Sequence, residues 1–340
     1  MNLIKHLLPQ VNRYFKTNLH THSTISDGRL TPEEVKEGYK ALGYQVLCLT
    51  DHNTIVNHSD MNEPDFLMLT GVEININSTD RDMINGKTYH LNMIAKDPEN
   101  LWYPAHVKRW FEVDEEIDSK IQYDDMKLEY STDCINELIA KATEKGFLVM
   151  YNHPTWSSQT YMDYAPLKGL WGMELRNTEC IMIGHNENNF KVYKDLLACG
   201  SRVFPLGTDD MHFRRALGKS WIMLGAKELT YESVIEALEK GDFYMSCGPE
   251  ITSMYLEGTM LKVTCSDAIR VTVETRGRFA RIAMAEDEPI REATFDLEKY
   301  LDLIKDDPDT FIFVTVTAAD GTYAATRAYF RDELICQSMS

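Results

Sequence analysis

Six of the ten histidines of this chain lie at or near the ends of predicted strands, beside carboxylates. His20 and His22 form an HxH immediately after the first apolar run, and side chains two apart on a strand point to the same face. Asp210 and His212 repeat that spacing after the run that ends at Leu206. Because neutral imidazoles and carboxylates are the ligands of divalent transition metals, the pattern predicts a metal site.

Each of these histidines has a simpler explanation when it is considered alone. A lone buried histidine is usually a satisfied core residue, and an HxH pair by itself is a weak signal. The whole set is harder to attribute to packing, because strand interiors prefer Val and Ile. In α/β barrels the carboxyl ends of the strands are where sites are built. The residues concerned are His20, His22, His52, Glu73, His90, His153, Asp210 and His212.

The stretch from about residue 14 to 247 alternates short apolar runs with helix signals. In the clearest signal, Thr31 caps a helix, Pro32 suits its first position and Glu34 completes a capping box. That helix should end at Gly43. Strand–helix repetition of this kind indicates a parallel sheet or barrel. The main expected strands cover about 15–19, 45–49, 68–73, 89–95, 147–151, 172–175 and 202–206, and further helices cover about 133–145 and 231–240.

Two changes of pattern predict the domain organisation. After Gly248 the sequence alternates with period two, as in 269–274 and 311–317, which is typical of a small all-β domain of sandwich type. We therefore expect one domain over 1–247, which carries the metal-site motifs, and an all-β domain over 248–340. Residues 97–130, rich in aromatic and acidic side chains, are interpreted as an insertion, either a solvated excursion or a lid over the site.

Composition narrows the choice of partners and of compartment. The formal charge of -18 disfavours nonspecific attraction to nucleic acid and to acidic membranes, so we expect no membrane partner and a nucleic acid only as a short or mononucleotide substrate. No apolar run approaches the roughly 20 residues of a membrane span, and the start of the chain lacks a signal-peptide core. The seven cysteines contain no CxxC pair, which favours a reducing compartment. We therefore predict a cytoplasmic protein.

Together these motifs resemble the PHP domain, a family named after polymerase and histidinol phosphatase. The resemblance covers roughly residues 14–247, and it implies a distorted seven-stranded (β/α) barrel that holds up to three metal ions. The motifs are HTHSTISDG (20–28), LTDHN (49–53), GVE (71–73), His90, NHP (152–154) and TDDMH (208–212).

The resemblance also implies how the ligands are shared among two or three divalent ions, which would be Zn, Mn or Fe. His20, His22, Glu73 and Asp210 would hold the first ion. Glu73 would bridge to a second ion, also held by His90 and His153, and Asp27, His52 and His212 would hold the third. For Asp27 a role as a turn residue in Ser-Asp-Gly is the competing interpretation. Asp51, which precedes a proposed ligand, is expected to orient an imidazole.

The leading functional hypothesis is that residues 1–247 form a metal-dependent phosphoesterase domain. It would hydrolyse a small phosphate mono- or diester, a class that includes nucleotide-like esters, with a metal-activated hydroxide. Glu73 and Asp210 count among its catalytic residues. Arg176, at a strand end, is the main candidate to clamp the phosphate, and His185 is a candidate general acid. Further candidate clamps are Arg214, Arg215 and Lys219, for which plain surface charge is the alternative.

Two other functions remain open. The β-rich tail and the DDxH wording also resemble carbaryl hydrolases, which implies hydrolysis of a carboxyl ester or carbamate by the same ions. Such an enzyme needs a more apolar pocket, to which Trp102, Trp110 and Trp156 could contribute, although core packing explains them equally well. The third hypothesis is a metal-retaining binding protein without turnover. The sequence indicates neither the native substrate nor the oligomeric state.

Overall fold

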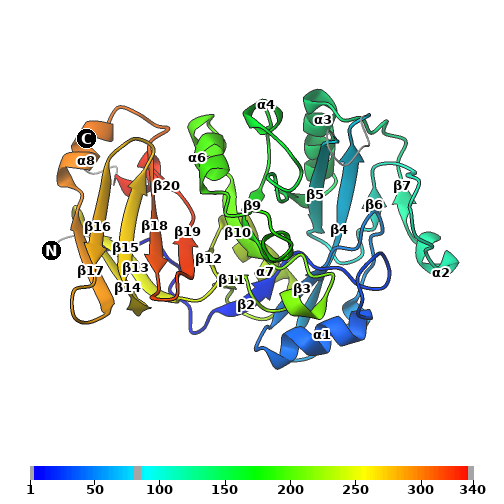
Figure 1. Ribbon diagram of the computed structural model, residues 1–340, viewed down its shortest axis with the longest axis horizontal. Coiled ribbons are helices and arrows are strands. Elements are labelled where there is room, and N and C mark those ends of the chain that lie inside the picture. Colours follow the sequence, from blue (N-terminus) through cyan, green and yellow to red (C-terminus); the bar gives the residue numbers. More distant parts are fainter. Residues whose placement is uncertain (1–3, 80–85, 336–340) are drawn as a thin grey trace.

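The computed structural model describes residues 4–79 and 86–335 (Figure 1). We call residues 15–246 the site half, because it contains the predicted ligands, and residues 251–335 the C-terminal part. The strands of the site half that form its main sheet are β2 (Phe15–Asn18), β3 (Val46–Leu49), β4 (Leu67–Asn77), β5 (Thr88–Ala95), β8 (Phe147–Tyr151), β9 (Gly172–Asn177), β10 (Phe204–Thr208), β11 (Trp221–Leu224) and β12 (Phe243–Ser246). Its helices are α1 (Pro32–Ala41), α2 (Glu115–Asp118), α3 (Thr132–Glu144), α4 (Tyr161–Tyr164), α5 (Thr178–Met182), α6 (Phe190–Ala198) and α7 (Tyr231–Lys240), with short 3₁₀ turns at Ser59–Met61 and Arg214–Ala216.

The C-terminal part lies at the opposite end of the molecule from α2, and Figure 1 draws it in yellow to red. Two short helices, α8 (Glu298–Ile304) and α9 (Arg331–Leu334), accompany its strands. The strands are β13 (Ile251–Glu257), β14 (Met260–Ala268), β15 (Arg270–Thr275), β16 (Ala280–Met284), β17 (Ile290–Asp296), β18 (Phe311–Thr317), β19 (Tyr323–Thr326) and β20 (Tyr329–Phe330).

One long sheet of 14 strands runs through both regions, in the order β10-β9-β8-β5-β4-β3-β2-β11-β12-β19-β18-β15-β16 with β20 beside β18. The pairing of β12 with β19 joins the site half to the C-terminal part. A second sheet of four strands has the order β1-β13-β14-β17, so that the N-terminal strand β1 (Ile4–His6) pairs with the C-terminal part. Each of the two sheets therefore combines strands from the site half or the N-terminus with strands of the C-terminal part.

The mixed α/β character is confirmed, but the expected closed barrel is not. Within the described ranges the long sheet is open, and no ladder joins β10 to β11. The backbones still approach closely, since a Cβ added at Gly207 in β10 would lie 3.1 Å from the carbonyl oxygen of Trp221 in β11. The sheet is also not all-parallel, because β5 pairs antiparallel with both β4 and β8. The strands β4 and β5 follow one another without a crossover helix, as an antiparallel pair can.

The local helix signals in the site half are confirmed. Thr31 Oγ1 accepts a hydrogen bond from the Glu34 backbone N–H at 3.3 Å, and the Glu34 carboxylate accepts one from Thr31 N–H at 3.0 Å. Pro32 is the first residue of α1, and Gly43 just beyond its end has a φ of +78°. These signals act within a single turn of chain, which explains why the sequence reveals them.

The C-terminal part shows the period-two pattern that the sequence predicts. Burial alternates along β14 and β15, and their inward side chains, with those of β13, β17 and β18, form an apolar cluster separate from that of the site half. It is nevertheless not purely β, because α8 and α9 belong to it. The proposed domain boundary at residue 248 falls in the connection between β12 and β13.

The insertion at 97–130 carries little regular structure. It contains α2 and a two-stranded pair of β6 (Trp102–Tyr103) with β7 (Gln122–Tyr123). None of the helices in the described parts has the length and apolar character that a membrane crossing requires. All cysteines in those parts are free thiols; Cys336 lies outside the described residues.

Candidate metal centre

The predicted ligands come together at one end of the site-half sheet, although they belong to distant stretches of chain. His20 and His22 follow β2, His52 follows β3, Glu73 and His90 lie on β4 and β5, and His153 and Asp210 follow β8 and β10. Three groups of these side chains have ligand atoms within 4.8 Å of one another and can each hold a metal ion. The groups are His20, His22, Glu73 and Asp210; His52, Glu73 and His90; and His22, Asp27, His52 and His212.

The first group is fully buried and has two carboxylates facing two imidazoles. His20 Nε2 lies 3.3 Å from Glu73 Oε2 and 3.1 Å from Asp210 Oδ1. His22 Nε2 lies 3.2 Å and 3.0 Å from the same two oxygens. These four residues are those that the resemblance assigns to a first ion, and the distances between their ligand atoms suit donors that face a common centre.

Glu73 links this group to the second. Its Oε1 lies 3.0 Å from His90 Nδ1 and 3.2 Å from His153 Nε2, while His52 Nδ1 is 3.2 Å from Oε2. His52 thus belongs to this group as well as to the third, whereas the resemblance assigned it to the third ion alone. A carboxylate surrounded by imidazoles on both oxygens is placed to bridge two ions.

The third group is more open to solvent, because Asp27 has a side chain that is 33% exposed. Asp27 Oδ1 lies 3.3 Å from His212 Nε2, and its two oxygens lie 3.9 Å from His22 and His52 nitrogens. The His22 and His212 rings stack with their centroids 4.1 Å apart. Asp27 therefore faces the imidazoles, and it also belongs to the turn at 24–27, which the Gly28 N–H closes on Ser23 O at 2.9 Å, so the two interpretations are compatible.

Buried polar atoms without a partner show that the residues fit a metal ion. Among the described residues, His22 Nδ1, His52 Nδ1, Glu73 Oε2 and Asp210 Oδ1 are buried and have no hydrogen-bond partner. Native proteins rarely leave such atoms unsatisfied, because removing them from water costs free energy. All four belong to the groups above, and a divalent cation would satisfy them together.

The proposed ligands differ in how their pKa values are shifted: burial opposes the change, but the facing carboxylates still raise the pKa of His22 to about 10 and that of His153 to about 9. Burial lowers the pKa of the His52 imidazole well below its ordinary value, which keeps it in the neutral form that binds metals. Burial alone would raise the pKa of Glu73, but the facing imidazoles, His20 first among them, outweigh it and hold that pKa well below the usual range. Glu73 is thus an anion buried among nitrogen ligands.

A further carboxylate, that of Glu174, holds the ligands in place, and the sequence reasoning missed it. Glu174, on β9, is fully buried and lies 2.6 Å from His20 Nδ1. Its other oxygen accepts hydrogen bonds from His153 N–H at 2.7 Å and from the Asn177 amide at 2.9 Å. The signal in the sequence was an acid inside an otherwise apolar strand, since such a residue must find partners in the interior.

The two aspartates that adjoin proposed ligands bind backbone instead of imidazoles. Asp51 accepts hydrogen bonds from the N–H groups and hydroxyls of Ser23 and Ser26, so it shapes the turn that carries Asp27 and does not orient an imidazole as expected. Asp209 accepts from three N–H groups of residues 218–220, and burial raises its pKa to about 6. Of these two neighbours, Asp210 faces the histidines and Asp209 does not.

Backbone strain is concentrated at this centre. Asp210, His153 and Asn53 all have positive φ values, of 50°, 22° and 50°. Left-handed backbone is unfavourable for residues other than glycine and persists where surrounding structure requires it, often at functional sites. Two of the three residues are proposed ligands, and Asn53 follows a third.

The structure places the predicted phosphate clamp and general acid away from the ligands. The Arg176 guanidinium donates to Ser220 Oγ at 3.0 Å and to Asn188 Oδ1 at 2.9 Å, and does not line the pocket over the ligands. His185 is exposed in the loop after α5 and does not line it either. These positions do not support the two roles. The Arg176 guanidinium instead lies 5.9 Å from the Tyr323 ring of β19, in the C-terminal part.

A pocket of about 410 Å³ lies over the ligands. Of the four candidate clamps, Arg215 alone lines it, and its guanidinium lies 2.6 Å from the Glu179 carboxylate. Trp110 from the insertion and Trp156 also line it, whereas Trp102 is buried in the core. The insertion therefore contributes one wall of the pocket.

Comparison with known proteins supports the family resemblance. The model of the PHP domain family matches residues 18–108, so the resemblance is confirmed over that stretch. The 5'-3' exoribonuclease of Haemophilus influenzae is 42% identical over 66 residues, which make up 18% of this chain and 24% of that protein. This chain thus spans about a quarter of the length of the curated relative that it matches.

Two solved structures show weak overall similarity. A two-domain protein from Bacteroides vulgatus, described as containing a predicted PHP-like metal-dependent phosphoesterase, has a TM-score of 0.41 and 16% identity, and the match covers 96% of this chain and 97% of that one. The lesion-specific endonuclease EndoQ of Pyrococcus furiosus has a TM-score of 0.40 and 14% identity over 67% of this chain and 56% of its own. Neither likeness transfers a fold or an activity to this chain.

Proposed function

We propose that this protein is a metal-dependent phosphoesterase that hydrolyses a small phosphate mono- or diester. The observation that carries the proposal is the buried carboxylate of Glu73, which has imidazole nitrogens within 3.3 Å on both oxygens and joins two groups of potential ligands. The match of residues 18–108 to the PHP domain supports the same conclusion.

In this proposal two or three divalent ions, of Zn, Mn or Fe, would supply an activated water and Lewis acidity toward the phosphate oxygens. Glu73 and Asp210 position the ions from the floor of the pocket. Asp27, on the open side, leaves the third position accessible to solvent. Glu174 orients the His20 ring through Nδ1 and fixes the backbone N–H of His153.

Arg215 is the residue that we propose to contact the phosphate. It lines the pocket and is paired with Glu179, whose Oε2 has no hydrogen-bond partner in the described part of the chain. A guanidinium can form two parallel hydrogen bonds with phosphate oxygens, which a lysine cannot. A phosphate monoester would therefore be held between Arg215 and the ions.

Hydrolysis of a carboxyl ester or carbamate is the second candidate function. The observation in its favour is the apolar rim of the pocket, where Trp110, Trp156 and Phe213 outnumber the single arginine. A neutral ester needs the ions but not Arg215. The two candidates therefore differ in their dependence on this side chain.

As partners we propose small phosphate esters, and a short or terminal nucleotide remains among them. The Haemophilus influenzae relative is an exoribonuclease, while the formal charge of -18 on this chain opposes long polyanions. We also keep the proposal of a cytoplasmic location, which rests on the pattern of free cysteines.

The test is a panel of substrates assayed on protein loaded with Mn²⁺, Zn²⁺ or Fe²⁺. We expect turnover of aryl phosphates, loss of at least a thousandfold in Glu73→Gln, and a loss of about a hundredfold in Arg215→Met, in line with the removal of a contact to a developing charge. Lys227→Met, an exposed cation outside the pocket, is the control.

Each result selects one hypothesis. Turnover of aryl esters or carbamates that survives Arg215→Met would establish the second candidate instead. Tight metal binding without hydrolysis of any member of the panel would establish a metal-retaining protein, the third hypothesis. A protein that binds no metal would overturn all of them.

A further inference from the structure

Large apolar side chains surround the mouth of the metal pocket and are unusually open to solvent. Trp110 is 56% exposed, Ile183 50% and Phe213 39%. Trp156 completes the rim and is half-buried. Scattered exposed hydrophobic residues need no explanation, but a contiguous set around a polar cavity indicates a binding surface.

The tryptophans of this rim are fixed relative to the proposed ligands. The Trp110 ring lies 5.0 Å from that of His52, and the Trp156 ring lies 4.9 Å from that of His153 and 5.3 Å from that of His90. The two indoles come from separate segments, the insertion and the loop after β8. Each is held against an imidazole that itself faces Glu73, so their distance from the centre is set by the ligand cluster.

Trp110 differs in its exposure from Trp102, the other tryptophan of the insertion. Trp102 is 6% exposed, donates through Nε1 to Asp124 at 3.1 Å and packs against Phe147 in the core. Trp110 leaves more than half of its surface in water beside the pocket. Its exposed surface is therefore available to a bound molecule.

The charges in the pocket limit how many phosphates a substrate can bring. Arg215 is the basic residue among the lining side chains, and it already pairs with Glu179 and lies 4.5 Å over the Phe213 ring. The remaining charged lining residues are carboxylates. One phosphate can be neutralised by the ions and Arg215, and the described lining of this pocket offers no second guanidinium or ammonium group for another.

We infer that the part of the substrate that carries the phosphate is a single flat aromatic group, which stacks on the Trp110 indole while the phosphate faces Glu73. The inference rests on the proposed phosphoesterase function and names its substrate class: a monophosphate of an aryl, benzylic or nucleobase-bearing alcohol. Trp110 is then a specificity-determining residue. A cavity of about 410 Å³ accommodates a group of that size.

The test compares two phosphates that differ only in the flatness of the ring, benzyl phosphate and cyclohexylmethyl phosphate. Both leaving groups are primary alcohols and both substrates carry one phosphate. We expect the metal-loaded wild type to prefer the benzyl ester by about tenfold in kcat/KM, the range that stacking on an aromatic side chain provides. Trp110→Leu should reduce the preference to less than threefold, and Trp110→Tyr should restore most of it.

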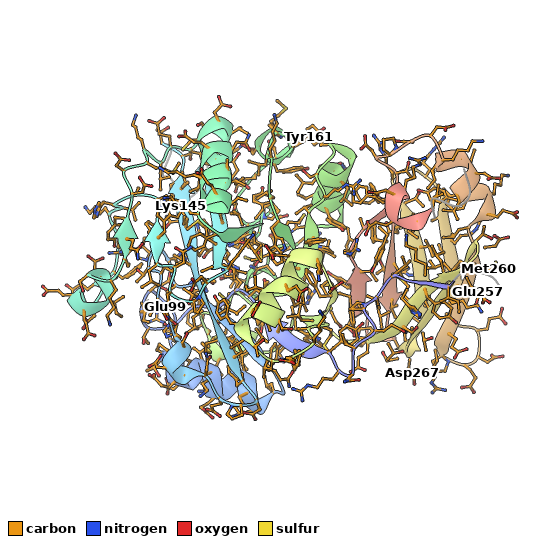
Figure 2. The ribbon with its side chains drawn as sticks, turned by 180° about the vertical axis from the view of Figure 1, so that it is seen from behind. Glu99, Lys145, Tyr161, Glu257, Met260 and Asp267 are labelled. Carbon is orange, nitrogen blue, oxygen red and sulfur yellow. The ribbon has the colours of Figure 1, made fainter. Side chains whose placement is uncertain are left out.

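The matched control is Tyr161→Leu. Tyr161 is a similarly exposed aromatic residue, at 51%, but lies at the periphery of the molecule, outside the lining of the pocket (Figure 2). Its substitution should leave the preference at the wild-type value. Far-ultraviolet circular dichroism of each variant checks that the fold is retained.

The possible outcomes separate this inference from the proposed function. If the wild type hydrolyses both esters equally, or if Trp110→Leu keeps the preference, the inference is overturned while the phosphoesterase stands. If neither ester is hydrolysed, the proposed function fails, and quenching of tryptophan fluorescence by benzylphosphonate and cyclohexylmethylphosphonate decides the inference. Equal affinity for the two phosphonates overturns it, and tighter binding of the benzyl compound that Trp110→Leu removes supports it.

Discussion

The site half and the C-terminal part bury very different side chains, although one sheet runs through both. In the site half, His20, Glu73, Glu174 and Asp209 are completely buried. In the C-terminal part the buried polar residues are threonines, and no charged side chain is buried there among the described residues. The apolar cluster around β13, β14 and β18 needs no ligand to be stable, whereas the charged cluster does.

The difference shows that the site half, and not the C-terminal part, buries charged groups at a cost in folding free energy. Burial of carboxylates and imidazoles costs desolvation free energy, and hydrogen bonds among them offset only part of it. The atoms of Glu73 and Asp210 that have no hydrogen-bond partner show this. A bound cation compensates for that cost. We therefore expect the stability of the site half to depend on metal, and that of the C-terminal part to depend on packing.

Removal of metal should have the largest effect on activity and stability, and it tests the difference between the two regions most directly. Treatment with a chelator should abolish hydrolysis and lower the free energy of unfolding by about 4 kcal/mol, the value for an ion present at roughly a thousand times its Kd. Differential scanning calorimetry with and without added Mn²⁺ or Zn²⁺ measures the change. An unfolding midpoint that does not respond to chelation would show that the buried charges are satisfied without ions.

A cavity in the C-terminal part should have a smaller effect and a different signature. Leu261 on β14 is fully buried in the apolar cluster, so Leu261→Ala should lower the free energy of unfolding by about 3 kcal/mol. Since the residue is remote from the ligands in sequence and packs only in that cluster, kcat/KM should stay within twofold of wild type. Denaturant unfolding and steady-state kinetics test the two halves of this prediction, and a large fall in kcat/KM would show that the regions are coupled.

The loss of the Glu174 charge should weaken the site without dismantling it. Glu174→Gln keeps the volume but replaces an acceptor oxygen opposite His20 or His153, so the affinity for metal should fall between about 10- and 100-fold. Isothermal titration with Zn²⁺ measures the affinity. The metal-free variant should unfold near the midpoint of metal-free wild type; a collapse of the metal-free form would instead assign Glu174 a role in folding alone.

Local signals explain how much the sequence could predict. The capping box of Thr31 and Glu34 and the glycine after α1 act over a few residues, and the structure contains both. The spacing of His20 and His22 puts both rings on one group of ligands, because it depends only on strand geometry.

Features that depend on long-range pairing were not predictable in the same way. The open sheet order, the antiparallel pairing of β4 with β5, and the pairing of β1 with β13 involve strands whose direction periodicity does not specify. Glu174 was missed because a single acid in an apolar strand gives no indication of its partners. Arg176 was misplaced because a strand end alone does not fix which neighbour the side chain meets.

Substitution of Arg176 should have the smallest effect on stability, and it tests the contact between the two regions most directly. Its guanidinium donates to Ser220 in the site half and lies 5.9 Å from the Tyr323 ring of β19, while Tyr323 and Arg176 both donate to Asn188 Oδ1, at 2.8 Å and 2.9 Å. Arg176→Met should lower the free energy of unfolding by about 1 kcal/mol, the usual value for hydrogen bonds at a part-exposed position, and leave kcat/KM within threefold.

The matched substitution Arg215→Met removes the same group from the pocket and should lower kcat/KM about a hundredfold. It should also lower the free energy of unfolding, because the buried Glu179 carboxylate loses its ion pair. If the two variants exchanged their signatures, Arg176 would contact the phosphate and the seam with the C-terminal part would belong to the active site. Arg176 would then have to reach the ligands from β9, and its guanidinium would have to break its hydrogen bonds to Ser220 and Asn188. A kinetic effect confined to Arg215 instead leaves Arg176 as a structural link between a region that depends on ions and one that depends on apolar packing.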